Sequence, residues 1–516
     1  MAFAALAPGL AAAADEAAAG GGAAEEVVVT GSRLARTNLE TSVPVVSVGG
    51  ADLVDKGITN LGDALNQLPQ LGAAGFTNTN TNFADDGAGI STLNLRNLGE
   101  SRTLVLVDGR RQVSGVAPGQ GSQAVDVSTI PTFMIDHVDI VTGGGSSSYG
   151  SEAIAGVVNI VLKDHFTGLE MNEQYGLSTY GDNKTETIDI VGGSDFAHGK
   201  GHSVFAINFQ DQGAVYSRSR DFAANDTTVT NGVPTYAPSS YSVDGRFLTD
   251  NGSFVTLGGN NIARYNSSYG FNREQVRTIS IPTTRVSFEN KTDYDLLDNV
   301  TWFLDARFAR TTAEQQLEPI AIGPTTTIGF GGQTLVLPIN NAFVPASLAA
   351  QGIVDDGNGN FADWRRRFVE LGDRGGNTER YNYVIASGFK GELFGDFKWD
   401  ASYQYGETKS YEHNNGGNVV NLQNALETTV INNQIVCADP NARAQGCVPV
   451  NVFGPGAISP AAINYIKAVK SYTTATRRPS STSTSTDLWR SFPMATCASR
   501  PASNIARNRV PTSPTP

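Results

Sequence analysis

From residue 168 onward, apolar and polar side chains alternate along the chain with a period of two. The clearest run places Phe397, Trp399, Ala401, Tyr403 and Tyr405 between Lys398, Asp400, Ser402, Gln404 and Gly406. Successive side chains of a strand point to opposite faces, so this pattern predicts antiparallel strands with one apolar face. A membrane-barrel strand, apolar toward lipid and polar toward the lumen, gives the same pattern. We expect strands near 168–180, 185–193, 202–217, 281–295, 300–313, 380–394 and 396–412.

The spacing of these strands favours a membrane barrel over a soluble sandwich. Several runs reach the roughly 9–11 residues that cross a bilayer at a tilt. After the first pair, short connections near 197–201, 295–299 and 394–396 alternate with long ones near 218–280, 314–379 and 413–470. Outer-membrane barrels have short periplasmic turns and long extracellular loops. We therefore predict that residues 167–470 form the N-terminal portion of an antiparallel transmembrane β-barrel.

Residues 41–166 have a different pattern, which predicts a compact α+β domain. Apolar runs at 43–48, 103–107, 135–141 and 156–162 are typical of strands. A short helix begins after Thr59, which we expect to be its N-cap, and ends before Pro69. A loop rich in Gly and Ser joins the last two strands.

Composition excludes several classes of function. The chain of 516 residues has 37 Lys and Arg against 50 Asp and Glu, a net charge of −13, which disfavours a nucleic-acid binder. No apolar run reaches the roughly 20 residues of a transmembrane helix. The sequence contains no nucleophile elbow and no metal-ligand spacing, so we expect neither an enzyme, nor a bound metal, nor a cofactor.

One block of sequence resembles the plug domain of TonB-dependent outer-membrane receptors. It comprises Leu95–Gly99, Leu106–Arg111, Ile130–Pro131, Ile135–Val141 and Gly143–Ile160. Together these segments are specific to the family, whereas each alone is weak. The plug-motif residues are Arg96, Gly99, Asp108, Gly109, Arg110, Gly143, Gly144, Gly145, Tyr149, Gly150, Gly156 and Asn159.

The resemblance implies a plug inside a 22-stranded barrel in the outer membrane of a Gram-negative cell. It implies active uptake of a scarce nutrient, such as a siderophore, a cobalamin or an oligosaccharide, driven through TonB with ExbB and ExbD. The segment Glu25, Glu26, Val27, Val28, Val29 and Thr30 resembles the family's TonB box. A valine-rich strand with flexible flanks can pair with a sheet edge of a partner. The alternative is an ordinary first strand of the plug.

Three arginines and two cysteines complete the candidate residues. Arg96, Arg110 and Arg111 are candidates for pairing with acidic groups of the barrel wall; the alternative is that they are solvated on the surface. Cys437 and Cys447 lie ten positions apart in the last long loop. In an exported protein we expect them to form a small extracellular disulfide rather than two free thiols.

The two ends of the chain differ from the rest. Residues 1–14 resemble the remnant of a signal peptide, and residues 15–40 form a flexible leader that holds the TonB box. From Arg477 to Pro516 there are six Arg, one Asp and no Gly, with a pure Ser/Thr run and several prolines. We interpret residues 471–516 as an aberrant, frame-shifted, disordered tail; a natural disordered tail is the alternative. The barrel would then be incomplete, with seven strands.

Two other functions remain open at this point. One is a non-transporting gene fragment, a plug with a few strands and no activity. The other is a surface adhesin anchored by a barrel, which predicts a long passenger and no plug, so the block from Leu95 to Ile160 argues against it.

Overall fold

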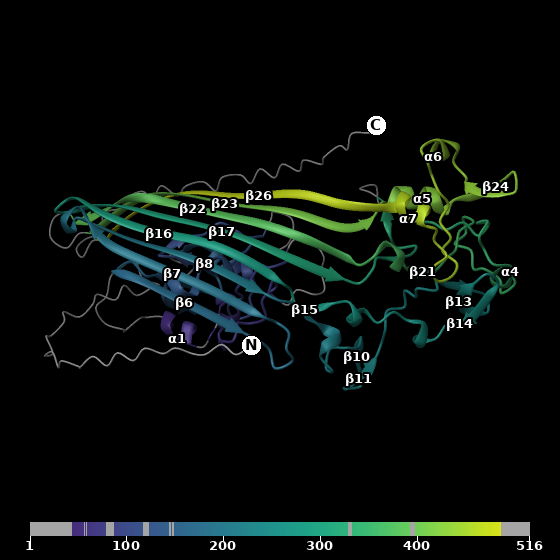
Figure 1. Ribbon diagram of the computed structural model, residues 1–516, viewed down its shortest axis with the longest axis horizontal. Helices are drawn as coiled ribbons and strands as arrows, with labels where there is room; N and C mark the ends of the chain where they lie inside the picture. Colours follow the sequence, from purple (N-terminus) through teal and green to yellow (C-terminus); the bar gives the residue numbers. More distant parts are fainter. Residues whose placement is uncertain are drawn as a thin grey trace, which may run out of the picture.

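The computed structural model describes residues 44–486, except 56, 58, 79–86, 117–122, 144–145, 147–148, 329–332 and 393–397. It contains an N-terminal domain, a large antiparallel sheet and a third body built from the long connections between the strands (Figure 1). The predicted TonB box, the signal-peptide remnant and the leader lie outside the described residues.

The N-terminal domain is built on a five-stranded sheet with the order β1-β4-β5-β2-β3. Its strands are β1 Val45–Gly49, β2 Thr103–Val107, β3 Arg110–Arg111, β4 Ile135–Val141 and β5 Gly156–Leu162. Its helices are α1 Gly50–Asp55 and α2 Leu61–Leu65, with 3-10 turns at Glu100–Arg102, Val127–Thr129, Thr132–Met134 and Ser151–Ala153. All five residues of β2 are buried, as expected of a central strand. The α+β prediction is confirmed.

The N-cap of α2 differs from the prediction. Asn60, not Thr59, has the extended backbone of an N-cap, and its side chain accepts hydrogen bonds from the backbone N–H groups of Gly62 and Asp63. Thr59 instead accepts a hydrogen bond from Gln210 of the large sheet at 2.9 Å. Both residue types cap helices well, so the sequence alone does not choose between them.

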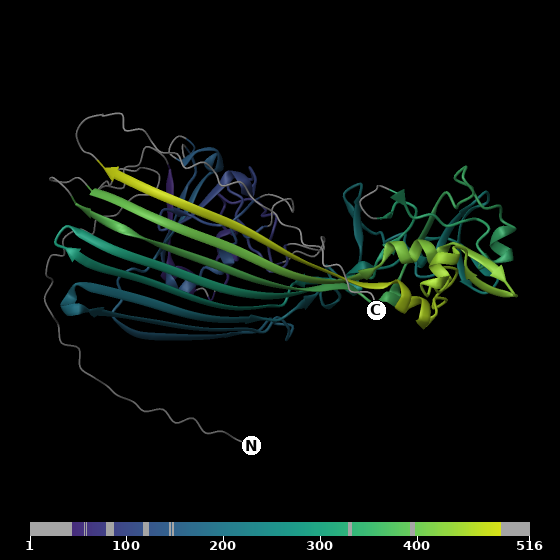
Figure 2. The same cartoon turned by 90° about the horizontal axis from the view of Figure 1, so that it is seen from above.

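The large sheet has eight antiparallel strands in the order β26-β23-β22-β17-β16-β8-β7-β6. These strands are β6 Gly168–Gly176, β7 Thr185–Phe196, β8 Gly201–Gln212, β16 Thr283–Leu297, β17 Val300–Leu317, β22 Arg374–Glu392, β23 Lys398–Gly417 and β26 Lys467–Thr486. After β7, the short connections gather at one end of the strands and the long connections at the other (Figure 1). The sheet curves around the N-terminal domain (Figures 1 and 2). In the part of the chain that the structure describes, β26 and β6 are each paired on one side only.

The prediction that residues 471–516 are disordered is wrong for residues 471–486, which belong to a strand. Strand β26 pairs with β23 without interruption from Gly417↔Lys467 to Lys398↔Thr486, so the sheet has eight strands rather than seven. Pro479 lies within this strand opposite Tyr405. A proline is tolerated on an edge strand, and threonines favour extended backbone, so main-chain pairing proceeds without an alternating side-chain pattern. Residues 487–516 lie outside the described residues.

The three long connections fold together into one body, which we call the cap (residues 217–282, 318–373 and 418–466). Its strands are β10 Thr227–Thr230, β11 Val233–Tyr236, β12 Arg246–Thr249, β13 Gly252–Gly258, β14 Asn261–Arg264, β15 Thr278–Ser280, β18 Ala321–Ile322, β19 Thr327–Ile328, β20 Gln333–Thr334, β21 Trp364–Arg367, β24 Thr428–Ile431 and β25 Gln434–Cys437; β9 Val215–Tyr216 pairs with β15. Its helices are α4 Ala346–Ala349, α5 Val419–Leu426, α6 Pro440–Ala444 and α7 Pro460–Ile466.

The cap has a hydrophobic core of its own. Phe247, Trp364 and Phe453, one from each long connection, are almost fully buried in a single cluster. Asn341 also donates a hydrogen bond to the backbone oxygen of Leu426, which ties the second connection to the third. Because the core is shared, the three connections form one packed unit rather than separate loops.

Membrane-spanning helices are not found: of the helices that the structure describes, none has the length and apolar character needed to cross a bilayer.

Cys437 and Cys447 are joined in a disulfide in the third connection of the cap, with their Cα atoms 6.3 Å apart. The bond closes the short segment that contains α6. Cys437 is fully buried, so the bridge lies at the edge of the cap core.

We predict that mass spectrometry of non-reduced, exported protein will find a peptide that links Cys437 to Cys447. Closing so short a loop should stabilise this segment by about 2–3 kcal/mol. Complete alkylation of both thiols without reductant would contradict the bridge.

Candidate functional site

Buried arginines on the inner face of the large sheet, the face that contacts the N-terminal domain, reach into that domain. Arg285 on β16 donates from Nη2 to the hydroxyl of Ser128 at 2.9 Å. Arg380 on β22 donates from Nη1 to the backbone oxygen of Ala88 at 3.1 Å. Both side chains are at least 97% buried. A buried charge is tolerated only when it is hydrogen-bonded, so these contacts fix how the domain sits on the sheet.

The turn between β2 and β3 is the part of the domain that faces the sheet most closely. Asp108 and Gly109 have φ values of 48° and 72°, as a two-residue type I′ turn requires. The side chain of Asn159 accepts from the N–H of Gly109 at 2.9 Å, and Asp108 accepts from the N–H of Leu162 at 3.0 Å. Strand β5 therefore holds the turn in one conformation.

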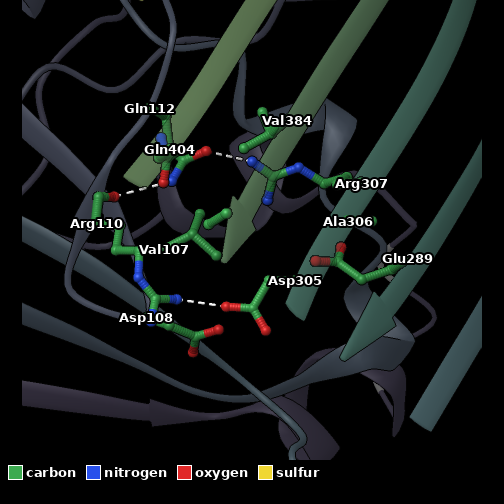
Figure 3. Close-up of a pocket in the computed structure, with 11 residues that line it drawn as sticks. Val107, Asp108, Arg110, Gln112, Glu289, Asp305, Ala306, Arg307, Val384 and Gln404 are labelled. Atoms are coloured by element: carbon green, nitrogen blue, oxygen red, sulfur yellow. Dashed lines mark hydrogen bonds and ion pairs between the residues drawn. The ribbon is translucent and has the colours of Figure 1, made fainter. Parts of the chain in front are cut away.

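Charged groups of this turn meet opposite charges on the sheet. Asp108 lies 3.0 Å from the Nζ atom of Lys291 on β16. Arg110 forms an ion pair with Asp305 on β17, and its guanidinium lies 4.4 Å from the ring centre of Phe303 (Figure 3). We call the contacts of Asp108 and Arg110 with Lys291 and Asp305 the ionic seam.

A small cavity of about 20 Å³ lies beside the ionic seam (Figure 3). Arg307 donates to Gln112 across it, and Gln404 donates to the backbone oxygen of Arg111 at 2.6 Å. Glu289 on β16 also lines the cavity, and one of its oxygens has no hydrogen-bond partner among the described residues. A cavity of this size holds about one water molecule, which suits a polar contact better than a ligand site.

Three titratable groups in the described part of the domain have shifted pKa values; burial is the largest cause for Arg111 and lowers its pKa. Burial raises the pKa of Asp63 on α2, and the nearby charge of Arg285 opposes that rise. The pKa of His137 is raised to about 9, chiefly by its hydrogen bond with Asp139 and further by the one with Asp136, while burial opposes the rise. This imidazole is therefore charged at neutral pH. Among the described residues, no group of three or more His, Cys, Asp or Glu side chains is arranged to hold a metal ion.

The structure brings part of the predicted plug motif together. Asp108, Gly109, Arg110 and Asn159 meet at the β2–β3 turn, as described above. Five further motif residues lie elsewhere in the domain: Gly99, Gly143, Tyr149, Gly150 and Gly156. The remaining two glycines, Gly144 and Gly145, lie outside the described residues. Gly99 and Gly150 have φ values of 102° and 79°, a region that favours glycine.

The three candidate arginines have different partners. Arg110 pairs with the sheet, as the sequence suggested for all three. Arg111 instead forms an ion pair with Glu152 of its own domain. Arg96 donates from Nη1 to the backbone oxygen of Thr142 at 3.0 Å, again within the domain.

Sequence reasoning missed the partners that the sheet supplies. Arg285, Arg307, Arg380, Lys291 and Asp305 were not among the candidate residues. A signal was present, because each occupies an inward position of the period-two pattern, for example Arg285 with Ser287 and Glu289. The strand register was needed to say which of these positions face the turn.

Gly156 offers a test of the domain's packing. It has a φ of +135°, and a Cβ there would lie 2.1 Å from the backbone oxygen of Val141. We predict that Gly156→Ala lowers the stability of the domain by about 2–4 kcal/mol, because both the backbone conformation and the space exclude a methyl group. This loss of stability should appear as faster hydrogen exchange of the β4 and β5 amides in the full-length variant than in the parent chain.

The matched control is Gly49→Ala, where the added Cβ would lie 3.6 Å from Asp52, an ordinary contact. Equal exchange rates in the two variants would contradict the packing described for Gly156.

Comparison with known proteins assigns the N-terminal domain. Residues 37–157 match the family model described as TonB-dependent Receptor Plug Domain. Among solved structures, the chain is similar to a ferric enterobactin receptor from Pseudomonas aeruginosa, PfeA, with 12% identity over 85% of this chain and 46% of that one, at a TM-score of 0.43. It is similar to the siderophore receptor PiuA from Acinetobacter baumannii, with 12% identity over 87% of this chain and 55% of that one, at a TM-score of 0.38.

A third similar structure is the ferric-catecholate import receptor Fiu from E. coli, with 13% identity over 91% of this chain and 66% of that one, at a TM-score of 0.38. The chain thus spans between 46% and 66% of the length of these structures. The match over residues 37–157 identifies the N-terminal domain as a plug domain of the kind found in TonB-dependent receptors.

Proposed function

We propose that the chain acts in the outer membrane as a TonB-dependent receptor for the active uptake of a scarce nutrient such as a siderophore, a cobalamin or an oligosaccharide. TonB, working with ExbB and ExbD, would supply the energy by pulling on the plug. The observation that carries the proposal is the ionic seam: a plug seated on the inner face of a long-stranded sheet by charged contacts.

The two faces of the sheet support a membrane location. Ile385, Phe389 and Tyr403 point away from the plug and are 53%, 44% and 57% exposed. Arg380 and Gln404, on the plug side of β22 and β23, are buried. A soluble protein would bury the first group and expose the second. An apolar outer face with a polar interior is the arrangement of a membrane barrel.

The chemistry of the plug contacts supports a plug that can move. The ion pair of Arg110 with Asp305 and the hydrogen bonds of Arg285 and Arg380 can be exchanged for water when the plug shifts. An apolar interface would expose its surface to water when the plug moves, at a free-energy cost of roughly 25 cal/mol for each Å² exposed. The polar part of the seating therefore lowers the cost of displacing the plug by a mechanical pull, whereas the apolar contact of Val191, Val204 and Ala206 with the plug core adds to that cost.

The predicted TonB box, Glu25–Thr30, precedes the plug in the sequence. A pull applied there would reach the plug through β1, which is its first strand and pairs with β4. Pairing with a strand of TonB would use main-chain hydrogen bonds, which resist a load along the strand.

We predict that Val28→Pro abolishes crosslinking of the full chain to TonB in cells, because proline removes an N–H donor and interrupts a pairing strand. Ala23→Pro, outside the box and in the same leader, is the control and should retain the crosslink. Crosslinking of Val28→Pro at the control level would rule out the assignment of residues 25–30 as the TonB box.

A further inference from the structure

We infer that a pocket between the strand ends and the cap binds a small, carboxylate-bearing, hydroxyl-rich molecule such as an acidic sugar. The inference rests on the proposed uptake function and names the class of substrate. The pocket has a volume of about 280 Å³ and lies where the large sheet passes into the cap (Figure 1). Among the described residues, it shares no lining residue with the small cavity beside the ionic seam, and none of its lining residues belongs to the plug.

The pocket is formed by a fork in the sheet. Pairing of β22 with β23 ends at Gly376↔Asn414, although β23 stays paired with β26 as far as Gly417. Strand β22 likewise stays paired with β17 as far as Arg374↔Leu317. Between the two strand pairs, the backbone of residues 415–417 has no ladder on its β22 side. Its donors and acceptors are therefore available to a polar molecule in the fork.

The lining is cationic although the chain is acidic. Arg374 and Lys470 are both among the lining residues, and none of the described residues that line the pocket is Asp or Glu. The chain as a whole has 50 acidic residues against 37 basic ones. Glu412 on β23, which accepts a hydrogen bond from the hydroxyl of Tyr472, is not among the lining residues. The lining thus selects for a negatively charged ligand.

Arg374 is held in place by Glu318 at the base of the cap. Its Nε donates to the backbone oxygen of Glu318 and its Nη2 to the Oε1 atom of the same residue, each at 3.0 Å. Neither bond uses Nη1, which has no hydrogen-bond partner among the described residues. A guanidinium fixed along one edge and open at another is preorganised to accept a carboxylate.

Glu318 does not cancel the positive charge of this region. Arg277 contacts its carboxylate at 2.8 Å and Arg367 lies 3.7 Å away, so three guanidinium groups surround one carboxylate. Burial alone would raise the pKa of Glu318, but the hydrogen bond and charge of Arg277 outweigh it and lower the pKa. Glu318 is therefore ionised at neutral pH and serves to position Arg374.

The other lining residues indicate a ligand that carries hydroxyl groups on a compact ring. Gln315, Asn414 and Asn415 line the pocket, and their amides are of the kind that bind hydroxyls both as donors and as acceptors. Leu317 and Ile320 provide an apolar surface. The volume is at the lower end of the roughly 300–1,000 Å³ of ligand pockets, which suits one or two sugar units. A uronic acid combines these features.

Isothermal titration of the full chain in detergent tests the inference, with galacturonate, citrate and neutral galactose as probes. We expect at least one of the two acids to bind, and galactose to bind at least tenfold more weakly. Tighter binding of galacturonate than of citrate would indicate an acidic sugar, and tighter binding of citrate would indicate a polycarboxylate.

Two variants and a control make the test specific to the pocket. Arg374→Gln should weaken acid binding at least tenfold. Gly416→Leu should block it while leaving every charge in place, because a Cβ at Gly416 points into open space. Arg264→Gln, on the exposed strand β14 of the cap, should bind the acid as the parent chain does. Near-ultraviolet circular dichroism of each variant checks that the fold is intact.

The inference is overturned if neither acid binds, if galactose binds as tightly as the acids, or if both pocket variants bind normally. Failure here is distinguishable from failure of the proposed uptake function. If TonB crosslinking at the box persists while no acid binds, the substrate class is wrong and the receptor function stands. If an acid binds while the crosslink is absent, the coupling is wrong and the pocket stands.

Discussion

The ion pair between Arg110 of the plug and Asp305 of the sheet is the contact around which the rest of the molecule is arranged. Arg110 follows the β2–β3 turn, whose conformation is set by Asn159 and by the backbone of β5. Asp305 lies on β17, in the middle of the sheet. The pair therefore joins a hydrogen-bonded turn of the plug to a central strand of the wall.

This arrangement separates three tasks. The plug has an apolar core, which Val191, Val204 and Ala206 of the sheet extend to the wall. Its other contacts with the wall include ion pairs and hydrogen bonds, which can be exchanged for water. The cap has a second apolar core, which is built from the three long connections. The proposed uptake function draws on these features together: a plug with an apolar core, partly polar seating and a packed cap.

Much of this architecture could be predicted from the sequence, because the period-two alternation and the spacing of connections are local signals. The plug strands were predicted for the same reason. Strand β26 was missed because its pairing with β23 depends on main-chain hydrogen bonds, and Pro479 with its Ser/Thr neighbours conceals it. The cap core and the partners of Arg110 were also missed, since residues such as Phe247 and Phe453, or Arg110 and Asp305, are about 200 positions apart.

A double-mutant cycle on Arg110 and Asp305 tests the central claim most directly. The free energy of plug opening would be measured by hydrogen exchange of the β2 amides in the full chain, for Arg110→Ala, Asp305→Ala and the double variant. The seam predicts that each single change lowers this free energy by about 1–3 kcal/mol, because it leaves a largely buried charge unpaired. The double variant should lose about 1 kcal/mol less than the sum of the two. Strict additivity, with no coupling between the two sites, would contradict the account of how the plug is held.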